Sequence, residues 1–108
     1  MGDRSQVVIH DSGSEVYLYT HWNGKTLPSL VAGSLFRGKS RWDDAPYLAR
    51  IIFSDMIRGD IDGLTGYGIS STYQDSNHPD IHIYVERKLI KYDGEDFDFQ
   101  MFIDNYSR

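Results

Sequence analysis

The chain contains no cysteine, which excludes disulfide bonds, thiolate catalysis and zinc sites built on thiolates. It also lacks any run of about 18 apolar residues, the length that a membrane-spanning helix requires. Its first residues have no signal-peptide pattern. We therefore expect a cytoplasmic protein that makes no contact with a membrane.

The residues that are present are sufficient for one domain. A length of 108 residues corresponds to a single domain. With 40% hydrophobic and 14% aromatic residues, the chain carries enough apolar surface for a core that is filled largely by rings. No repeat, low-complexity segment or linker divides it. We predict one domain over residues 1–108.

The charged residues are distributed unevenly around a net charge of −5. Residues 25–58 carry six basic and three acidic side chains, whereas residues 59–108 carry four basic and ten acidic ones. Within the acidic part, residues 92–99 interleave carboxylates with rings. This segment is either an acidic edge that meets a basic groove on a partner, or a hairpin turn at Asp93-Gly94 before a charged edge strand.

Two segments near the start predict a β-hairpin. Residues 5–10 and 15–21 are rich in β-branched and aromatic side chains, and the residues between them have turn composition. The second strand has one aromatic and one aliphatic face. The sequence leaves open whether Tyr17, Tyr19 and His21 face the core or the solvent, because that depends on the register.

Two helices are predicted next. Thr26 is placed to cap the first with its hydroxyl group, and Gly38 is placed to end it. Asp43 or Asp44 should cap the second, which we expect to end near residues 58–59. Its apolar stripe at helical spacing comprises Leu48, Ile51, Ile52 and Met56.

The remainder of the chain predicts three or four strands and a short terminal helix. Residues 67–73 and 81–85 alternate as strands do, and residues 88–92 either extend the second strand or pair back on it. A hairpin, two helices and then three or four strands form an α+β order. We predict a small α+β domain in which a helix pair covers one face of an antiparallel sheet.

Four blocks of the chain resemble a group of short, uncharacterised bacterial and phage proteins. The blocks begin at Tyr19, Arg41, Tyr47 and Thr65, and they read YTHWNG, RWDD, YLARIIF and TGYGIS. The resemblance spans roughly residues 15–75, and its motif carries no assigned chemistry. It implies a phage or a mobile element as the source, and small proteins of that kind often act by binding and inhibiting a host protein.

The first expected function is therefore the binding of a host protein, without a cofactor. Tyrosine and tryptophan usually anchor protein interfaces, and in this chain they stand beside ionisable residues at the ends of predicted elements. The predicted binding residues are Tyr19, His21, Trp22, Arg41, Trp42 and Asp44.

Two other functions remain open. His21 with Asp43 or Asp44 would form an imidazole oriented by a carboxylate, which can move protons near neutral pH in a small enzyme. No nucleophile with a matching context accompanies them. The basic residues of 37–42, with Trp42 as a stacking platform, could instead bind a nucleic-acid backbone. The acidic character of the whole chain disfavours this third function.

No metal site is predicted. Residues 60–63 resemble the start of a calcium loop, but the following positions lack the closing ligands. His78 and His82 have a ligand-like spacing, yet Pro79 and the expected strand argue against a helical zinc site. The glycines of residues 63–68 indicate a turn with a close backbone approach, because they precede a strand rather than open a helix.

Overall fold

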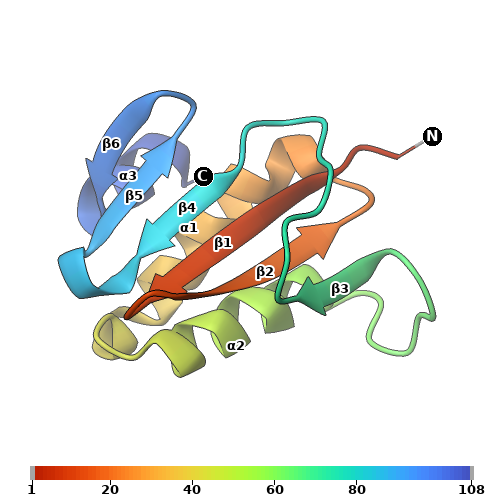
Figure 1. Cartoon of the computed structure of the whole chain (residues 1–108), viewed down its shortest axis with the longest axis horizontal. Helices are drawn as coiled ribbons and strands as arrows, with labels where there is room; N and C mark the ends of the chain where they lie inside the picture. Colours follow the sequence, from red (N-terminus) through yellow and green to blue (C-terminus); the bar gives the residue numbers. More distant parts are fainter. Residues whose placement is uncertain (1, 108) are drawn as a thin grey trace.

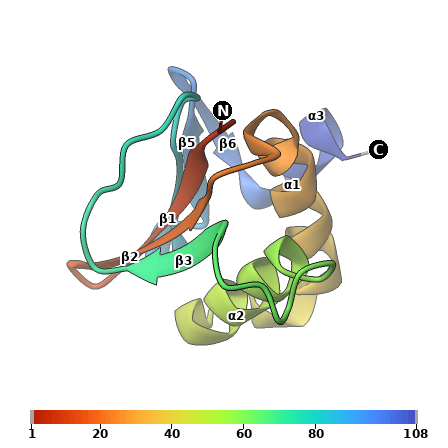
Figure 2. The same cartoon turned by 90° about the vertical axis from the view of Figure 1, so that its right-hand side faces the viewer.

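The protein is built of two layers, a six-stranded sheet with three α-helices on one of its faces (Figures 1 and 2). The computed structural model describes residues 2–107. The strands are β1 (Ser5–Asp11), β2 (Ser14–Thr20), β3 (Tyr67–Ser70), β4 (Ile81–Tyr84), β5 (Leu89–Tyr92) and β6 (Glu95–Asp98). The helices are α1 (Leu27–Arg37), α2 (Ala45–Met56) and α3 (Phe99–Tyr106), and the short 3₁₀ helices are η1 (Gly24–Thr26), η2 (Lys39–Arg41) and η3 (Val85–Arg87). The predicted α+β class is confirmed, and no helix within residues 2–107 is long and apolar enough to cross a membrane.

The predicted hairpin forms from β1 and β2. Ser12 and Gly13 connect the strands with positive φ angles of 53° and 84°, which is the backbone conformation that tight hairpins favour. The register places Val7 opposite Leu18, and both face the helices. Tyr17 therefore points to the other side of the sheet, which we call the open face.

The strand order is β3-β2-β1-β4-β5-β6, and every neighbouring pair is antiparallel except β1 with β4, which is parallel. The prediction of an antiparallel sheet therefore fails at this one pair. Because β3 and β4 run in the same direction, the chain between them must return to the starting end of the sheet. Residues 71–80, the crossing segment, make this return over the open face (Figures 1 and 2). The pairing with β1 fully buries Ile81 and Ile83.

The helix caps differ in detail from the prediction. Thr26 and Asp44 occupy the N-cap positions of α1 and α2 as expected, but neither side chain makes a capping hydrogen bond. The Thr26 hydroxyl group instead donates to the Asn23 carbonyl oxygen at 2.9 Å. A true side-chain cap begins α3, where the Asp98 carboxylate accepts from the backbone N–H of Met101 at 2.7 Å.

The core lies between the sheet and the helices. α1 is the middle helix and contacts both α2 and α3, while α2 packs on β1 and β2. The fully buried side chains include Leu48 and Ile52 of the predicted stripe, and the terminal helix adds Phe99 and Phe102. Gly38 occupies the C-cap position of α1, as predicted, and its backbone N–H donates the last helical hydrogen bond to the Ser34 carbonyl oxygen at 2.8 Å.

Candidate functional sites

The structure does not bring His21 close to Asp43 or Asp44. His21 directly follows β2, whereas α2 begins beside the opposite end of that strand, where Ala45 lines a surface depression with the first residues of β2. A strand of this length separates the two ends by about 20 Å at about 3.3 Å per residue. Asp43 forms an ion pair with Lys88 instead. The imidazole and the carboxylates thus do not form a catalytic pair in this structure.

The residues between α1 and α2 belong largely to the scaffold. The Trp42 indole N–H donates to the Leu35 carbonyl oxygen at 3.0 Å, and its ring meets Phe99 edge to face with 5.3 Å between centroids. The Arg41 guanidinium lies 4.6 Å from the centroid of the Tyr47 ring. The structure therefore gives Trp42 a packing role at the far end of α1 from Trp22.

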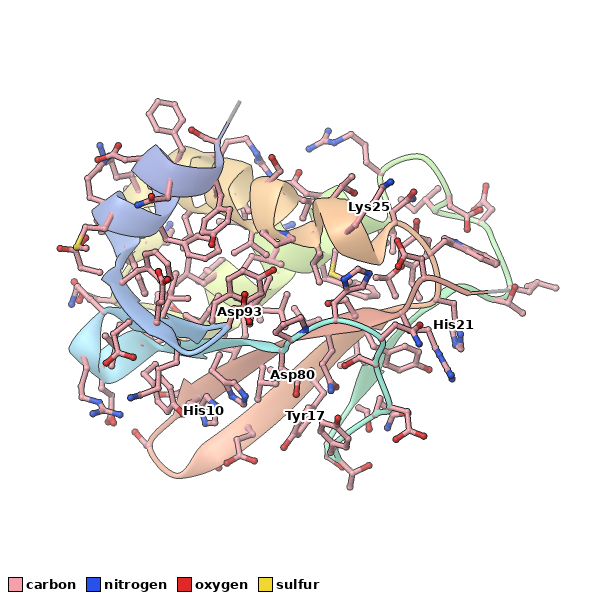
Figure 3. The ribbon with its side chains drawn as sticks, turned by 90° about the horizontal axis from the view of Figure 1, so that it is seen from above. His10, Tyr17, His21, Lys25, Asp80 and Asp93 are labelled. Carbon is pink, nitrogen blue, oxygen red and sulfur yellow. The ribbon has the colours of Figure 1, made fainter. Side chains whose placement is uncertain are left out.

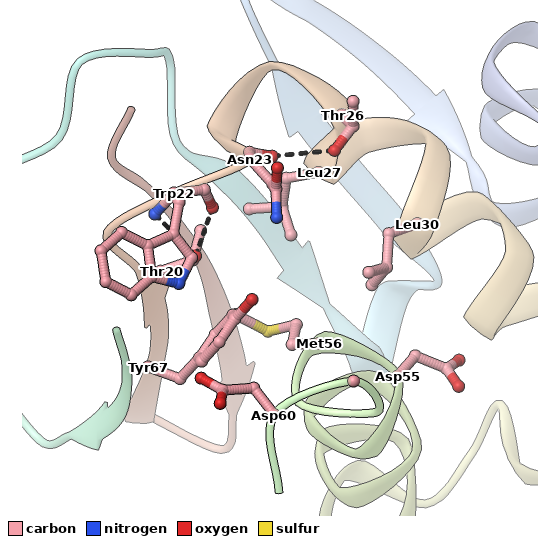
Figure 4. A pocket seen from close by; sticks show the side chains of 11 residues that line it. Thr20, Trp22, Asn23, Thr26, Leu27, Leu30, Asp55, Met56, Asp60 and Tyr67 are labelled. Carbon is pink, nitrogen blue, oxygen red and sulfur yellow. Dashed lines mark hydrogen bonds between the residues drawn. The ribbon is translucent and has the colours of Figure 1, made fainter. Parts of the chain in front are cut away.

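A pocket of about 440 Å³ opens where β2, η1, α1, α2 and β3 meet (Figure 4). We call it the aromatic pocket. Its rings come from Trp22, directly after β2, and from Tyr67 of β3. The residues that line it include Trp22, Leu27, Leu30, Met56, Asp60 and Tyr67. The aromatic pocket is thus formed by segments that are distant in the sequence.

Two glycines of the predicted close approach support aromatic rings. Gly66 has a φ of 103°, and a Cβ atom built there would lie 2.7 Å from Cε2 of Trp22. A Cβ atom on Gly68 would lie 2.6 Å from Cε2 of Tyr19. Only glycine fits beneath these rings in this arrangement. The Trp22 backbone N–H also donates to the Thr20 hydroxyl oxygen at 3.1 Å, which fixes the backbone that carries the ring.

The two carboxylates of the aromatic pocket differ in their partners. Asp55 accepts hydrogen bonds from Ser34 at 2.6 Å, from Arg37 at 2.8 Å and from Arg58. Partial burial acts to raise the pKa of Asp55, but these three donors together lower it. Within residues 2–107, by contrast, no cationic side chain pairs with the carboxylate of Asp60. One negative charge of the pocket is thus compensated, and the other, which lies against Gly63 of its own turn, has no cationic partner within residues 2–107.

A second cluster lies on the open face, and we call it the histidine patch (Figure 3). The His10 Nε2 and His82 Nδ1 atoms are 2.9 Å apart, and the His10 ring stacks on Tyr84 with 4.1 Å between centroids. His10 Nδ1 lies 3.6 Å from a Glu15 carboxylate oxygen, and the Tyr17 hydroxyl group donates to Glu15 at 3.0 Å. Strands β1, β2 and β4 thereby align these five side chains, which are His10, Glu15, Tyr17, His82 and Tyr84.

The protonation of the histidine patch follows from these contacts. Burial lowers the pKa of His10, the neighbouring His82 lowers it further, and Glu15 opposes the change. A hydrogen bond between the two rings requires that one nitrogen donates and the other accepts. The hydrogen bond to Glu15 raises the pKa of Tyr17, whose hydroxyl group donates to that carboxylate.

The lowered pKa of His10 predicts a loss of stability in mild acid. An unfolded His10 takes up its proton near pH 6.5, whereas the folded one does so only at lower pH. The unfolded state then binds more protons, so the free energy of unfolding should fall as the pH falls below 6.5. Urea unfolding at about pH 7.5 and about pH 5 measures this loss, which should be smaller in His10→Gln.

The exposed His21 provides the control for that experiment. His21→Gln should keep the pH dependence of the unmodified protein, because the His21 ring makes only edge and tilted contacts with Tyr19 and Trp22. An equal pH dependence in His10→Gln and the unmodified protein would contradict the assignment to His10.

The sequence did not reveal the histidine patch. His10 and His82 are 72 residues apart, and only the parallel pairing of β1 with β4 makes them neighbours. His78, which shares a ligand-like spacing with His82, pairs with Asp3 instead. No group of three metal-ligating side chains is formed by the residues that the structure describes.

The acidic residues near the C-terminus form the predicted turn and edge strand. Asp93 and Gly94 have positive φ angles of 52° and 80°, and β6 is the last strand of the sheet. Lys91 lies within 3.5 Å of the Asp96 carboxylate across this hairpin. The interpretation of this segment as a hairpin turn before a charged edge strand is confirmed, and its charges lie along an exposed edge.

Comparison of the chain with known protein families, curated proteins and solved structures gives no match. The side chains that could bind a ligand or a partner gather at two places, the histidine patch on the open face and the aromatic pocket at the end of β2.

Proposed function

We propose that the protein acts by binding a host protein, as a small interaction or inhibitor protein of phage or mobile-element type. The observation that carries the proposal is the histidine patch, whose rings are held in place on the open face before any partner arrives. Tyrosine and arginine are enriched among interface anchors, and prearranged rings lose little conformational entropy on binding. Arg87, 4.9 Å from the centroid of the Tyr84 ring, extends the patch at one edge.

The charges around the patch favour a partner with basic groups. Glu15 and Glu86 are exposed on or beside the open face, and the whole chain has a net charge of −5. Opposite charges on two surfaces accelerate their encounter and fix their relative orientation. Tyr19 lies on the same face of β2 as Tyr17, so this predicted binding residue belongs to the proposed interface.

The remaining parts of the proposal concern location and source. The absence of cysteine supports the cytoplasm of the host as the location. The sequence resemblance supports a phage or mobile element as the source. Trp22 is retained as a binding residue, but at the aromatic pocket rather than at the histidine patch.

The two alternative functions have less support. Catalysis by His21 would need Asp43 or Asp44 within reach, and these residues stand at the other end of β2. Nucleic-acid binding by residues 37–42 would need free cations and a free indole. Arg37 is paired with Asp55, and Trp42 is hydrogen-bonded into the scaffold, which leaves Lys39 and Arg41 of this segment to contact a phosphate backbone.

Loss of the Tyr17 ring should weaken partner binding by about tenfold or more, because it removes an aromatic anchor from the patch. Tagged protein is used to capture host proteins, and the affinity of the captured partner is then measured for the unmodified protein and for Tyr17→Ala. The fold should survive, since the hydroxyl group bonds only to the exposed Glu15 and the ring meets Tyr73 at its edge.

Tyr47→Ala is the matched control for Tyr17→Ala. Tyr47 is a tyrosine that is 45% exposed, but it lies on α2 in the helical layer. Its removal should leave the affinity unchanged. A folded Tyr17→Ala protein with full affinity would remove the histidine patch from the interface, and the lack of any specifically captured host protein would count against the proposed function itself.

A further inference from the structure

We infer that the aromatic pocket binds an organic cation, that is, an ammonium or guanidinium group carried by a small molecule or by a basic side chain. The pocket is distinct from the histidine patch, and this inference does not rest on the proposed host partner. Its basis is a free carboxylate beside two aromatic rings in a hollow of suitable size.

Two aromatic rings, those of Trp22 and Tyr67, are available to a ligand in the pocket. Trp22 is 44% exposed, although most large apolar side chains of this protein are buried, and it lines the pocket together with Tyr67. Figure 4 shows these two rings and Asp60 on one side of the pocket, with Leu30 and Asp55 on the other. Aromatic faces attract cations, and tryptophan does so most strongly.

The two carboxylates of the pocket, those of Asp55 and Asp60, differ in whether a cation of the protein compensates them. Asp55 already accepts hydrogen bonds from Ser34 and two arginines, so its charge is compensated within the protein. Asp60 lines the same pocket, is only partly exposed, and has no cationic partner among residues 2–107. An anionic ligand would be repelled by Asp60, whereas a neutral ligand would desolvate it without compensation. A cation removes this cost.

The remaining lining decides between an organic cation and a metal ion. Leu27, Leu30 and Met56 provide hydrocarbon and thioether surface, and the hydroxyl groups of Thr20 and Thr26 are already bonded to backbone carbonyl oxygens. Hard metal ions require several oxygen ligands, and the described residues form no group of three His, Asp or Glu side chains that could hold one. Alkyl groups next to the positive charge would contact these side chains. A volume of about 440 Å³ lies in the range of about 300–1,000 Å³ that small organic ligands occupy.

The test is a titration followed by nitrogen–proton correlation spectra of the full chain. The two indole N–H signals are assigned with Trp22→Phe, and Trp42 serves as the internal reference because its N–H is bonded to Leu35. Choline, N-acetylarginine amide and N-acetyllysine amide are the cationic probes. The neutral probe is the isostere in which carbon replaces the quaternary nitrogen of choline.

We expect at least one cation to shift the Trp22 signal to saturation, while the neutral isostere does not. Asp60→Asn should weaken that binding by about tenfold, because it keeps the shape of the side chain but removes its charge. Asp62→Asn removes one charge from the same exposed turn, outside the pocket lining, and should leave the affinity unchanged. The backbone hydrogen bond from Gly63 N–H to the Asp60 carbonyl oxygen does not depend on either carboxylate.

Three results would overturn the inference. They are the absence of any Trp22 shift with all three cations, an equal response to the neutral isostere, and full affinity in a folded Asp60→Asn protein. If choline binds most tightly, the natural ligand is a free organic cation. If the arginine or lysine amide binds most tightly, it is a basic side chain of another protein, and in both cases the same ion-binding chemistry holds.

Discussion

Replacing Phe102 with alanine is expected to lower the free energy of unfolding by about 3–5 kcal/mol. The Phe102 ring is fully buried in α3, and it contacts the rings of Phe97 at 5.4 Å and Tyr106 at 4.6 Å between centroids. Its removal leaves a cavity where the terminal helix meets the end of the sheet. Urea unfolding followed by circular dichroism measures the loss.

Met101→Ala is the control for this substitution. Met101 precedes Phe102 in the same helix but is 47% exposed, so its truncation should change stability by no more than about 0.5 kcal/mol. The capping bond from the Met101 backbone N–H to Asp98 is retained in the variant. A similar loss in both variants would show that α3 does not anchor the core through Phe102.

Replacing Gln6 with alanine is expected to lower the free energy of unfolding by about 2–4 kcal/mol. Gln6 is fully buried under the crossing segment, and its side-chain N–H groups donate to the Gln74 carbonyl oxygen at 2.7 Å and to Asp80 at 3.1 Å. Its side-chain oxygen accepts from the Gln74 backbone N–H at 3.2 Å. The substitution removes these three hydrogen bonds from Gln74 and Asp80, which are partly buried, although Asp80 keeps its bond from the Ser76 hydroxyl group.

Hydrogen exchange locates the effect of the Gln6 substitution. The backbone N–H of Gln74 should exchange faster in Gln6→Ala, because the crossing segment loses its central attachment. Gln100→Ala is the matched control, since Gln100 is exposed on α3 and bonds only to Asp104. Unchanged exchange at Gln74 would contradict the role assigned to Gln6.

Local sequence signals predicted the elements of the fold well. The hairpin turn required positive φ angles at Ser12 and Gly13. The apolar spacing of α2 marked Leu48, Ile52 and Met56, which are buried, and Ile51, which is only partly buried. The parallel pairing of β4 with β1 could not be predicted, because it depends on the path of residues 71–80 over the sheet. Hydrogen bonds from Gln6 hold that path, and they join residues 68 positions apart.

The candidate sites were predicted only in part. The glycines at positions 66 and 68 indicated a close approach, and the structure places the rings of Trp22 and Tyr19 above them. In the sequence alone, the acidic turn that includes Asp60 resembles only the start of a calcium loop. Its place in the pocket cannot be predicted there, because its neighbours come from β2, η1, α1, α2 and β3. Residues that become neighbours only through tertiary packing leave no local signal.

The position of β1 in the middle of the sheet has a consequence for synthesis on the ribosome. β1 is made first, and β2 can pair with it at once, but its other edge must wait for Ile81, which pairs with Val7. Until then a largely apolar strand edge is open to other chains, and such edges promote aggregation. Long-range pairing of this kind also slows folding. The nascent chain therefore depends on the later synthesis of β4 to protect this edge of β1.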